Sequence, residues 1–331
     1  MKKCKLLFVF TLIFSLFFLL CVTSSFSATF NWKVSSNWAP DQLESRTVDH
    51  FVDLVNEKSN GEIKLTYYPS GQLGNSLAVL EMLQAGEIEV AVDTSNWLTR
   101  LTPELDVLSF PYAIRDNEHL ARIQKSEWYI ELKKKTYETK GINILADNGF
   151  RLPRHLYTKT KGIITPEDLK GVKLRMPDVK VQVETWGDLG ADISIVPWQE
   201  VATSIATGLL DGADGPATSL YSMKFYEVAP HITLTGHTFD FVSILVSRIH
   251  WEKLPPELQQ IMASCATEAL VWFTDEVGKV WEADKAKMTQ EGAKFYEIDK
   301  EVWMKKILEI AKKSEEKGQL PEGLFEKIQN M

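Results

Sequence analysis

An arginine near the middle of the chain has the sequence context of a binding residue for a small acid. Arg175 lies in the run 165–177, at the predicted end of a short strand, and a second arginine precedes it at Arg151 or Arg154. A guanidinium held at a strand end can donate two parallel charge-assisted hydrogen bonds to a carboxylate. The sequence therefore predicts a site for a small organic anion, with Arg175 as its main binding residue.

Sequence patterns of catalysis are absent from the 331 residues. The chain has no G-x-S-x-G, no phosphate-binding Gly-Lys-Ser/Thr loop, no G-x-G-x-x-G and no H-E-x-x-H. His231 and His237 could share one strand face, but the sequence offers no third ligand near them, so we expect no metal site. We predict a protein without cofactor that is not an enzyme. A periplasmic enzyme on a similar scaffold remains the alternative, because fold does not dictate function.

The first 27 residues have the order of a secretory signal peptide. Three lysines stand among the first five residues, an apolar run covers 6–22, and small residues follow at positions 25 and 27. We expect cleavage after Ser27 or Ala28 and a periplasmic mature protein. A permanent membrane anchor is the alternative, since the apolar run is close to the shortest length that spans a bilayer. Lipidation of Cys21 is disfavoured because Leu20 precedes it.

Charge and cysteine content narrow the class of protein further. The chain carries 37 basic and 45 acidic residues, and the basic count falls to 34 without the three lysines of segment 1–27. An acidic protein is a poor partner for nucleic acid, so we expect no nucleic-acid binding. Cys265 is the single cysteine after residue 27, which leaves no internal disulfide. About 300 mature residues predict two domains, and we expect a monomer.

Strands and helices alternate along most of the chain, which predicts an α/β fold with helices on both faces of a sheet. From Pro256 an apolar pattern at helical spacing continues to Gln290, and such a helix would be about 50 Å long, enough to pass from one domain to the other. We expect domain I at 28–150 plus about 240–280, and domain II at 151–239 plus about 281–331, with the ligand cleft between them. The predicted strands are 32–36, 63–68, 88–92, 172–175, 193–196 and 241–246, and the predicted helices are 45–58, 76–85, 179–189, 199–207 and 256–290.

Five segments in order resemble the solute-binding proteins of tripartite ATP-independent periplasmic (TRAP) transporters, over essentially the whole mature chain. They are the helix at 51–61, the run 68–74 (YPSGQLG), the run 108–112 (LSFPY), the segment around Arg175 and the segment 211–216 (DGADGP). The resemblance implies a periplasmic-binding-protein-like fold of two α/β domains. Hinge strands and a long domain-spanning helix near the C-terminus join these domains, which close around the ligand.

The resemblance also implies which residues bind the ligand. Arg175 occupies the position of the family arginine that binds the ligand carboxylate. For the second family arginine Arg154 fits by spacing and Arg151 by its Gly-Phe-Arg context, and the choice stays open with Arg154 favoured. Gly215 stands where many relatives have an asparagine, which leaves room for ligand, and Asn75 stands where an acidic residue is frequent. The remaining candidates lie mostly at strand ends, where ligands of open α/β sheets bind: Asn37, Trp38, Asp93, Asn96, Trp198, Asp214 and His237.

Taken together, these patterns predict an extracytoplasmic receptor that binds a small carboxylate, with a sugar acid favoured. The resemblance implies that it delivers this ligand to TRAP transporter membrane subunits. A periplasmic sensor that presents a bound acid to a signalling partner is the alternative function. Closure around the ligand is expected as a population shift, because only the closed state makes both sets of contacts.

Overall fold

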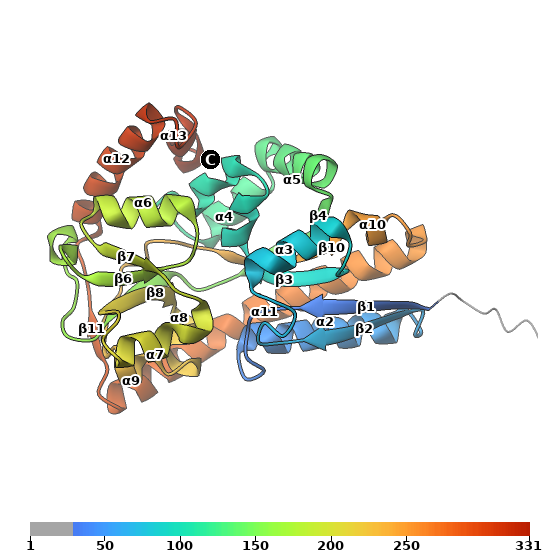
Figure 1. The fold of residues 1–331 in the computed structure, drawn as a ribbon, viewed down its shortest axis with the longest axis horizontal. Coiled ribbons are helices and arrows are strands. Elements are labelled where there is room, and N and C mark those ends of the chain that lie inside the picture. The colour runs from blue at the N-terminus through green and yellow to red at the C-terminus, as the bar shows by residue number, and fades with distance from the viewer. Residues whose placement is uncertain (1–28) are drawn as a thin grey trace, which may run out of the picture.

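The computed structural model describes residues 29–331, which form two mixed β-sheets surrounded by helices (Figure 1). The predicted signal peptide at 1–27 lies outside the described residues. The first sheet has the order β2-β1-β3-β10-β4. Its strands are β1 (Phe30–Ser35), β2 (Ile63–Tyr68), β3 (Val90–Thr94), β4 (Ile142–Phe150) and β10 (Phe241–Ser247). Strands β1, β2 and β3 run parallel, whereas β10 is antiparallel to both β3 and β4.

The second sheet has the order β11-β9-β5-β8-β6-β7. Its strands are β5 (Arg154–Thr158), β6 (Lys173–Met176), β7 (Asp192–Ile195), β8 (Gly212–Pro216), β9 (His231–Thr233) and β11 (Lys294–Tyr296). Parallel pairing of β6 with β7 and β8 brings the carboxyl ends of these three strands to one edge. Arg175 lies near that edge, because β6 ends one residue after it.

Two connections cross between the sheets and run side by side. Residues 151–153 lead from β4 to β5, and residues 234–240 lead from β9 to β10. The backbone N–H of Arg151 donates to the carbonyl of Asp240 at 3.2 Å, and that of Arg154 donates to the carbonyl of Thr238 at 2.9 Å. The crossing segments therefore place arginines and an aspartate where the two units meet.

Helix α11 (Pro256–Gln290) has the bounds that its apolar period predicts. Its first part buries Leu258, Met262 and Phe273 against the core of the first sheet, and Met288 near its end packs in the core of the second sheet. Figure 1 shows it running along both units. The predicted α/β class and the long spanning helix are confirmed.

The remaining helices cover the sheets. Around the first sheet lie α2 (Leu43–Lys58), α3 (Ser76–Ala85), α4 (Asn117–Gln124), α5 (Glu127–Lys140) and α10 (Arg248–Trp251). Around the second lie α6 (Lys180–Asp188), α7 (Val201–Ala206), α8 (Ala217–Ser222), α9 (Phe225–Val228) and α12 (Lys300–Glu316). In the part of the chain that the structure describes, no helix combines the length and apolarity needed to cross a membrane.

The last helix, α13 (Leu324–Gln329), returns to the first unit. Phe325 packs edge-on against Phe110 at 5.3 Å, and the His119 ring bonds the carbonyl of Ile328 at 2.9 Å. Helix α12 instead packs on α6 of the second unit. The domain limits at about 150, 240 and 280 stay a prediction. We propose that the segment after residue 317 belongs with domain I.

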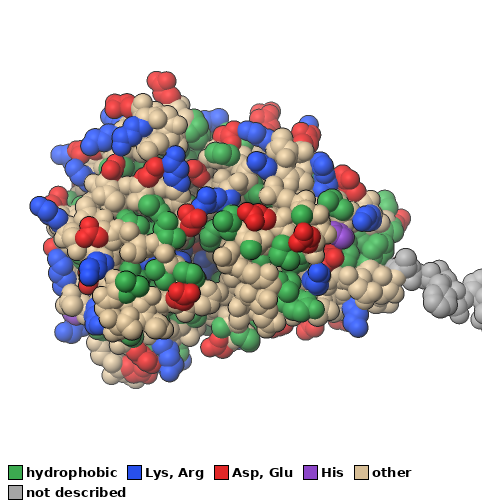
Figure 2. All heavy atoms as spheres, viewed as in Figure 1, with side chains coloured by type: hydrophobic (Ala, Val, Ile, Leu, Met, Phe, Trp, Pro, Cys, Tyr) green, Lys and Arg blue, Asp and Glu red, His purple; other side chains and the backbone are tan. Residues whose placement is uncertain are grey.

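On the face shown in Figure 2, basic and acidic side chains are interspersed.

Candidate functional site

A cavity of about 260 Å³ lies between the two sheets. This volume is slightly below that of most ligand pockets, which commonly measure roughly 300–1,000 Å³. Its walls come from strand ends and the loops that follow them, on both units. The lining residues are Asn37, Trp38, Asn75, Ser76, Leu77, Asp93, Thr94, Asn96, Trp97, Arg151, Arg154, Arg175, Pro177, Asp178, Ile195, Val196, Pro197, Trp198, Gln199 and Pro216.

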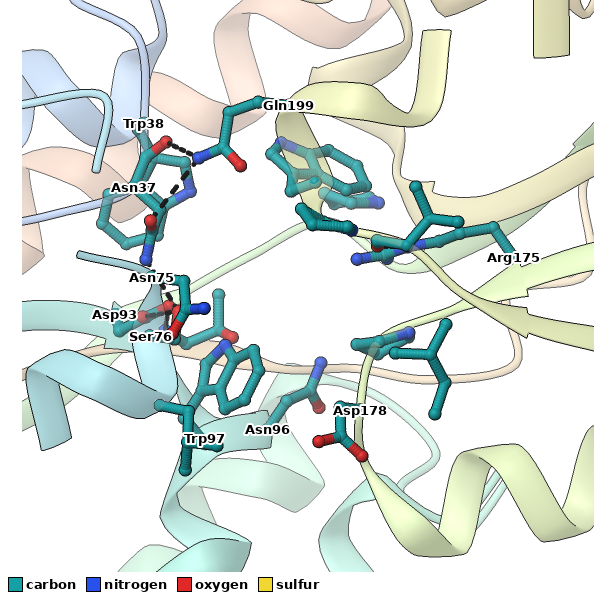
Figure 3. A pocket seen from close by; sticks show the side chains of 18 of the residues that line it. Asn37, Trp38, Asn75, Ser76, Asp93, Asn96, Trp97, Arg175, Asp178 and Gln199 are labelled. Carbon is teal, nitrogen blue, oxygen red and sulfur yellow. Dashed lines mark hydrogen bonds between the residues drawn. The ribbon is translucent and has the colours of Figure 1, made fainter. Parts of the chain in front are cut away.

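Arg175 projects from the second unit into this cavity (Figure 3). Its Nε donates to the carbonyl of Val196 at 2.8 Å, and its guanidinium carbon lies 5.4 Å from the centre of the Trp198 ring. Within residues 29–331 no acceptor is hydrogen-bonded to Nη1 or Nη2 of Arg175 and no carboxylate forms an ion pair with it. Burial lowers the pKa of Arg175 to about 10, so the side chain stays charged at neutral pH. The Nε of the guanidinium group is thus fixed by a hydrogen bond, while both terminal amino groups remain available to a ligand.

The other two arginines of the cavity are neutralised by buried carboxylates. Arg151 donates to Glu44 at 2.6 Å and to Oδ2 of Asp240 at 3.3 Å. Arg154 donates from Nη1 to the same oxygen at 3.3 Å, and from Nε to Oδ2 of Asp214 at 2.5 Å. Three buried carboxylates therefore face three buried arginines, and Arg175 is the arginine among them without a carboxylate partner in the described chain.

This row of charges fixes the ionisation of its members. Burial lowers the pKa of Arg154, but the carboxylates of Asp214 and Asp240 outweigh it, and the net pKa is raised. Burial raises the pKa of Asp214, but Arg154 and the His237 ring outweigh it, and the net pKa is lowered. The pKa of His237 is lowered, mainly by burial. Arg154 and Asp214 therefore stay ionised across the physiological range, and His237 favours its neutral form.

The cavity wall opposite Arg175 contains the carboxylate of Asp93, which is held by hydrogen bonds and not by an arginine. We call the three residues Asn37, Ser76 and Asp93 the Asp93 wall. The Asn37 amide donates to Ser76 Oγ at 2.7 Å, and Ser76 Oγ donates to Asp93 Oδ2 at 2.5 Å. The backbone N–H of Thr94 donates to Asp93 Oδ1 at 2.8 Å. Burial raises the pKa of Asp93 to about 6 despite these donors. No lysine or arginine of the described chain forms an ion pair with Asp93, and Figure 3 shows this wall facing Arg175 across the cavity.

Contacts cross the mouth of the cavity on two sides. Gln199 Nε2 donates to the carbonyl of Asn37 at 2.9 Å, and Arg100 forms an ion pair with Asp178 at 2.6 Å. Asn37 and Arg100 belong to the first unit, whereas Gln199 and Asp178 belong to the second. The structure is therefore a closed arrangement of the two units.

Nine of the twelve predicted ligand-binding residues line the cavity. Arg151 and Arg154, the two alternatives for the second arginine, are both among them. Asn75 lines the cavity while its Oδ1 accepts from the Ala78 N–H at 3.0 Å as the N-cap of α3. Asn96 Oδ1 accepts from Ser109 at 3.1 Å and from Gln182 at 3.3 Å. The nine are Arg175, Arg154, Arg151, Asn37, Trp38, Asn75, Asp93, Asn96 and Trp198.

Asp214, Gly215 and His237 lie behind the cavity wall. The Asp214 carboxylate is engaged by Arg154 and by His237 Nε2, the latter at 3.3 Å. A Cβ added to Gly215 would lie 3.1 Å from the Trp198 ring and 3.2 Å from that of Tyr157. The absent side chain at Gly215 thus makes room for Trp198, whereas the sequence had suggested room for the ligand.

Sequence reasoning missed several residues that shape the site. Ser76, Asp178 and Gln199 line the cavity. Ser76 directly follows Asn75 and could have been found as a hydroxyl group at the first position of the same predicted helix. Glu44 and Asp240 have no local signal, because they are 107 and 89 residues from their partner Arg151.

The fold has two α/β units joined by crossing connections. Residues of both units line a cavity in which Arg175 has no carboxylate partner in the described chain. These features are those of a two-domain solute-binding protein. The family model described as bacterial extracellular solute-binding protein, family 7, matches residues 34–317. The chain belongs to this family, whose members are solute receptors outside the cytoplasm.

Relatives of known sequence or structure show the range of the family. The 2,3-diketo-L-gulonate-binding periplasmic protein of Escherichia coli is 31% identical over 221 residues, 66% of each chain. A TRAP solute-binding protein from Ochrobacterium anthropi with bound L-fuconate is 27% identical, covers 92% of this chain and 99% of its own, and has a TM-score of 0.84. One from Fusobacterium with bound sn-glycerol-3-phosphate is 25% identical, covers 91% and 96%, and has a TM-score of 0.85.

Proposed function

We propose that this protein is the periplasmic receptor of a TRAP transporter and binds a small sugar acid as a monocarboxylate. The ligand carboxylate accepts two parallel hydrogen bonds from the terminal amino groups of Arg175. Its hydroxyl groups meet the Asp93 wall and the other polar side chains of the first unit. The closed receptor then delivers the acid to the membrane subunits of the transporter.

The observation that carries this proposal is the fork of Arg175, which points into the cavity and has no carboxylate partner in the described chain. Each other arginine there already has buried carboxylate partners. A ligand carboxylate would supply the direct ion-pair partner that Arg175 lacks. The relatives that bind diketogulonate and fuconate support a sugar acid as the ligand.

Export and the absence of catalysis are parts of the same proposal. The order of charge and hydrophobicity in residues 1–27 favours a cleaved signal peptide, and we propose that the mature protein acts in the periplasm as a monomer. No enzymatic step is proposed, because the family consists of receptors and the cavity residues are held in hydrogen bonds and ion pairs that suit binding.

The ligand class can be tested by a thermal-shift screen of the mature protein. Hexonates and hexuronates should raise the melting temperature, because a ligand at a hundred times its Kd stabilises the folded state by about 2.7 kcal/mol. The neutral sugars of the same carbon skeleton serve as controls and should produce no shift. Stabilisation by neutral sugars alone, or by no acid at all, would contradict a carboxylate receptor.

The ion pair across the mouth should slow ligand release. Arg100 and Asp178 are about one-third and one-half exposed, and such pairs contribute up to about 1 kcal/mol. We therefore expect Arg100→Ala to accelerate dissociation by up to about fivefold at low salt, with a smaller effect at high salt. Stopped-flow measurement of dissociation tests this. Lys58→Ala is the matched control, since its pair with Glu268 is similarly exposed and does not line the cavity. Equal rates for the parent and Arg100→Ala would exclude a role for this pair in closure.

A further inference from the structure

We propose that Asp93 selects the charge of the ligand: it favours singly charged acids with a hydroxyl group at the end remote from Arg175 and disfavours acids with a second negative charge there. This inference rests on the proposed function, because it takes the ligand carboxylate to be bound by Arg175. The family itself does not fix the choice. One structural neighbour holds a sugar acid and another a phosphate ester, which can carry two negative charges.

The charge distribution of the cavity carries the argument. The cavity has a cation without a carboxylate partner on one wall, Arg175, and a carboxylate without a cation partner on the other, Asp93. A ligand with one carboxylate and a remote hydroxyl group complements both ends, since the hydroxyl donates to the Asp93 carboxylate. A ligand with a carboxylate at each end would bring two like charges together in a largely desolvated place, which is unfavourable.

The surroundings of Asp93 supply hydrogen-bond donors and little positive charge. Ser76 comes from α3, Asn37 from the connection after β1, and Ser243 from β10, where its Oγ donates to the carbonyl of Asp93 at 3.1 Å. The positive charge of Arg151, on the β4–β5 connection, lowers the pKa of Asp93. Its effect is weaker than that of burial and weaker than those of the hydrogen bonds to the Asp93 carboxylate. Arg151 is itself held by Glu44 at 2.6 Å. A second ligand carboxylate would thus find no free cation at this wall among the described residues.

The two ligand classes should therefore couple to protons with opposite sign. A hydroxyl donor to the Asp93 carboxylate favours its charged form, so the pKa falls from about 6 and binding releases protons near pH 6. A second carboxylate disfavours the charged form, so the pKa rises and binding takes up protons. Affinity for the monoacid should weaken below about pH 6, and affinity for the diacid should weaken as the pH rises above it.

The test compares acids that differ only at the remote end. D-Gluconate and D-galactonate carry a terminal CH₂OH, whereas D-glucarate and galactarate carry a carboxylate in its place. Calorimetric titration at pH 8 measures the affinities with Asp93 ionised, and titration at pH 6 in two buffers of different ionisation enthalpy measures the proton exchange. The parent should prefer the tighter-bound hexonate over its diacid by at least about tenfold, since each unit of pKa shift corresponds to tenfold in affinity. Asp93→Asn should reduce this preference to within about threefold and abolish the proton exchange near pH 6.

Asp53→Asn is the control, because Asp53 is an exposed carboxylate on α2. It should keep the selectivity and the proton exchange of the parent. Equal affinity of the parent for both acids, or unchanged selectivity in Asp93→Asn, would overturn the role of Asp93 while leaving an Arg175-dependent receptor intact. If none of the acids bound, the proposed function and this inference would both fall.

Discussion

Arg175→Lys should bind sugar acids at least about thirtyfold more weakly than the parent. Losing a desolvated, hydrogen-bonded charge pair costs on the order of 2–5 kcal/mol, and each 1.4 kcal/mol corresponds to tenfold in Kd. Arginine is needed because its Nε is held by the Val196 carbonyl at 2.8 Å, which leaves both terminal amino groups available to a ligand carboxylate. Lysine presents a single ammonium group that cannot make these three bonds at once.

The expected loss of affinity separates a binding role from a structural one. Arg175 is buried without a carboxylate partner in the described chain, so its charge should not stabilise the ligand-free fold. Arg175→Met should therefore keep or raise the melting temperature without ligand while binding is lost. Lys173→Arg, on the same strand but exposed, is the control and should bind as the parent does. Calorimetric titration and thermal melts of the three variants provide both readouts. A folded Arg175→Lys protein with the parent's affinity would refute the central assignment.

Arg154→Lys should weaken binding less than Arg175→Lys does. The guanidinium of Arg154 is already engaged by Asp214 and Asp240, so its contribution to the ligand is indirect. The same titrations test this order of effects, and a larger loss in Arg154→Lys would make Arg154 the main carboxylate contact.

Local sequence patterns predicted the helices and strands, because these depend on residues that are close together in the sequence. The apolar period from Pro256 to Gln290 is a property of one continuous segment, and the observed helix has those bounds. Gly86 ends α3 in the left-handed conformation, as a glycine after an apolar helical run predicts. Strand β3 was expected at 88–92 and is found at Val90–Thr94. The strand itself was identified from its apolar residues, but both of its ends lie two residues later than predicted.

Contacts between distant segments could not be predicted in this way. Arg175 was found because its strand-end position is visible in the sequence. Arg175 has no carboxylate partner because Asp214 on β8 pairs instead with Arg154 on β5, the antiparallel neighbour of β8. The sequence suggested Asp214 as a ligand-binding residue, and the structure instead makes it the partner of Arg154. Such pairing follows from sheet register, which no spacing within either segment reveals.

Asp240→Asn should destabilise the ligand-free protein by about 3–5 kcal/mol. One oxygen of Asp240 accepts from Arg151 and from Arg154, both at 3.3 Å, and all three side chains are buried. Asparagine keeps an acceptor but removes the negative charge, which leaves the three buried arginines of the site with two buried carboxylates, Glu44 and Asp214. Removing one partner of a buried ion pair costs far more than the net contribution of the pair, because the remaining charge stays desolvated.

Urea denaturation at pH 7.5, followed by circular dichroism and by tryptophan fluorescence, measures this loss. Glu138→Gln is the control, since it breaks an exposed pair with Lys134 on α5 and should change the free energy of unfolding by less than about 0.5 kcal/mol. If Asp240→Asn matched the control, the carboxylate would not be needed to hold the two arginines. Because Asp240 lies on the connection between β9 and β10 and both arginines lie at the connection between β4 and β5, the loss should fall on the junction of the two units. Asp240 would then stabilise the relative position of the two units, which places Arg175 opposite the Asp93 wall.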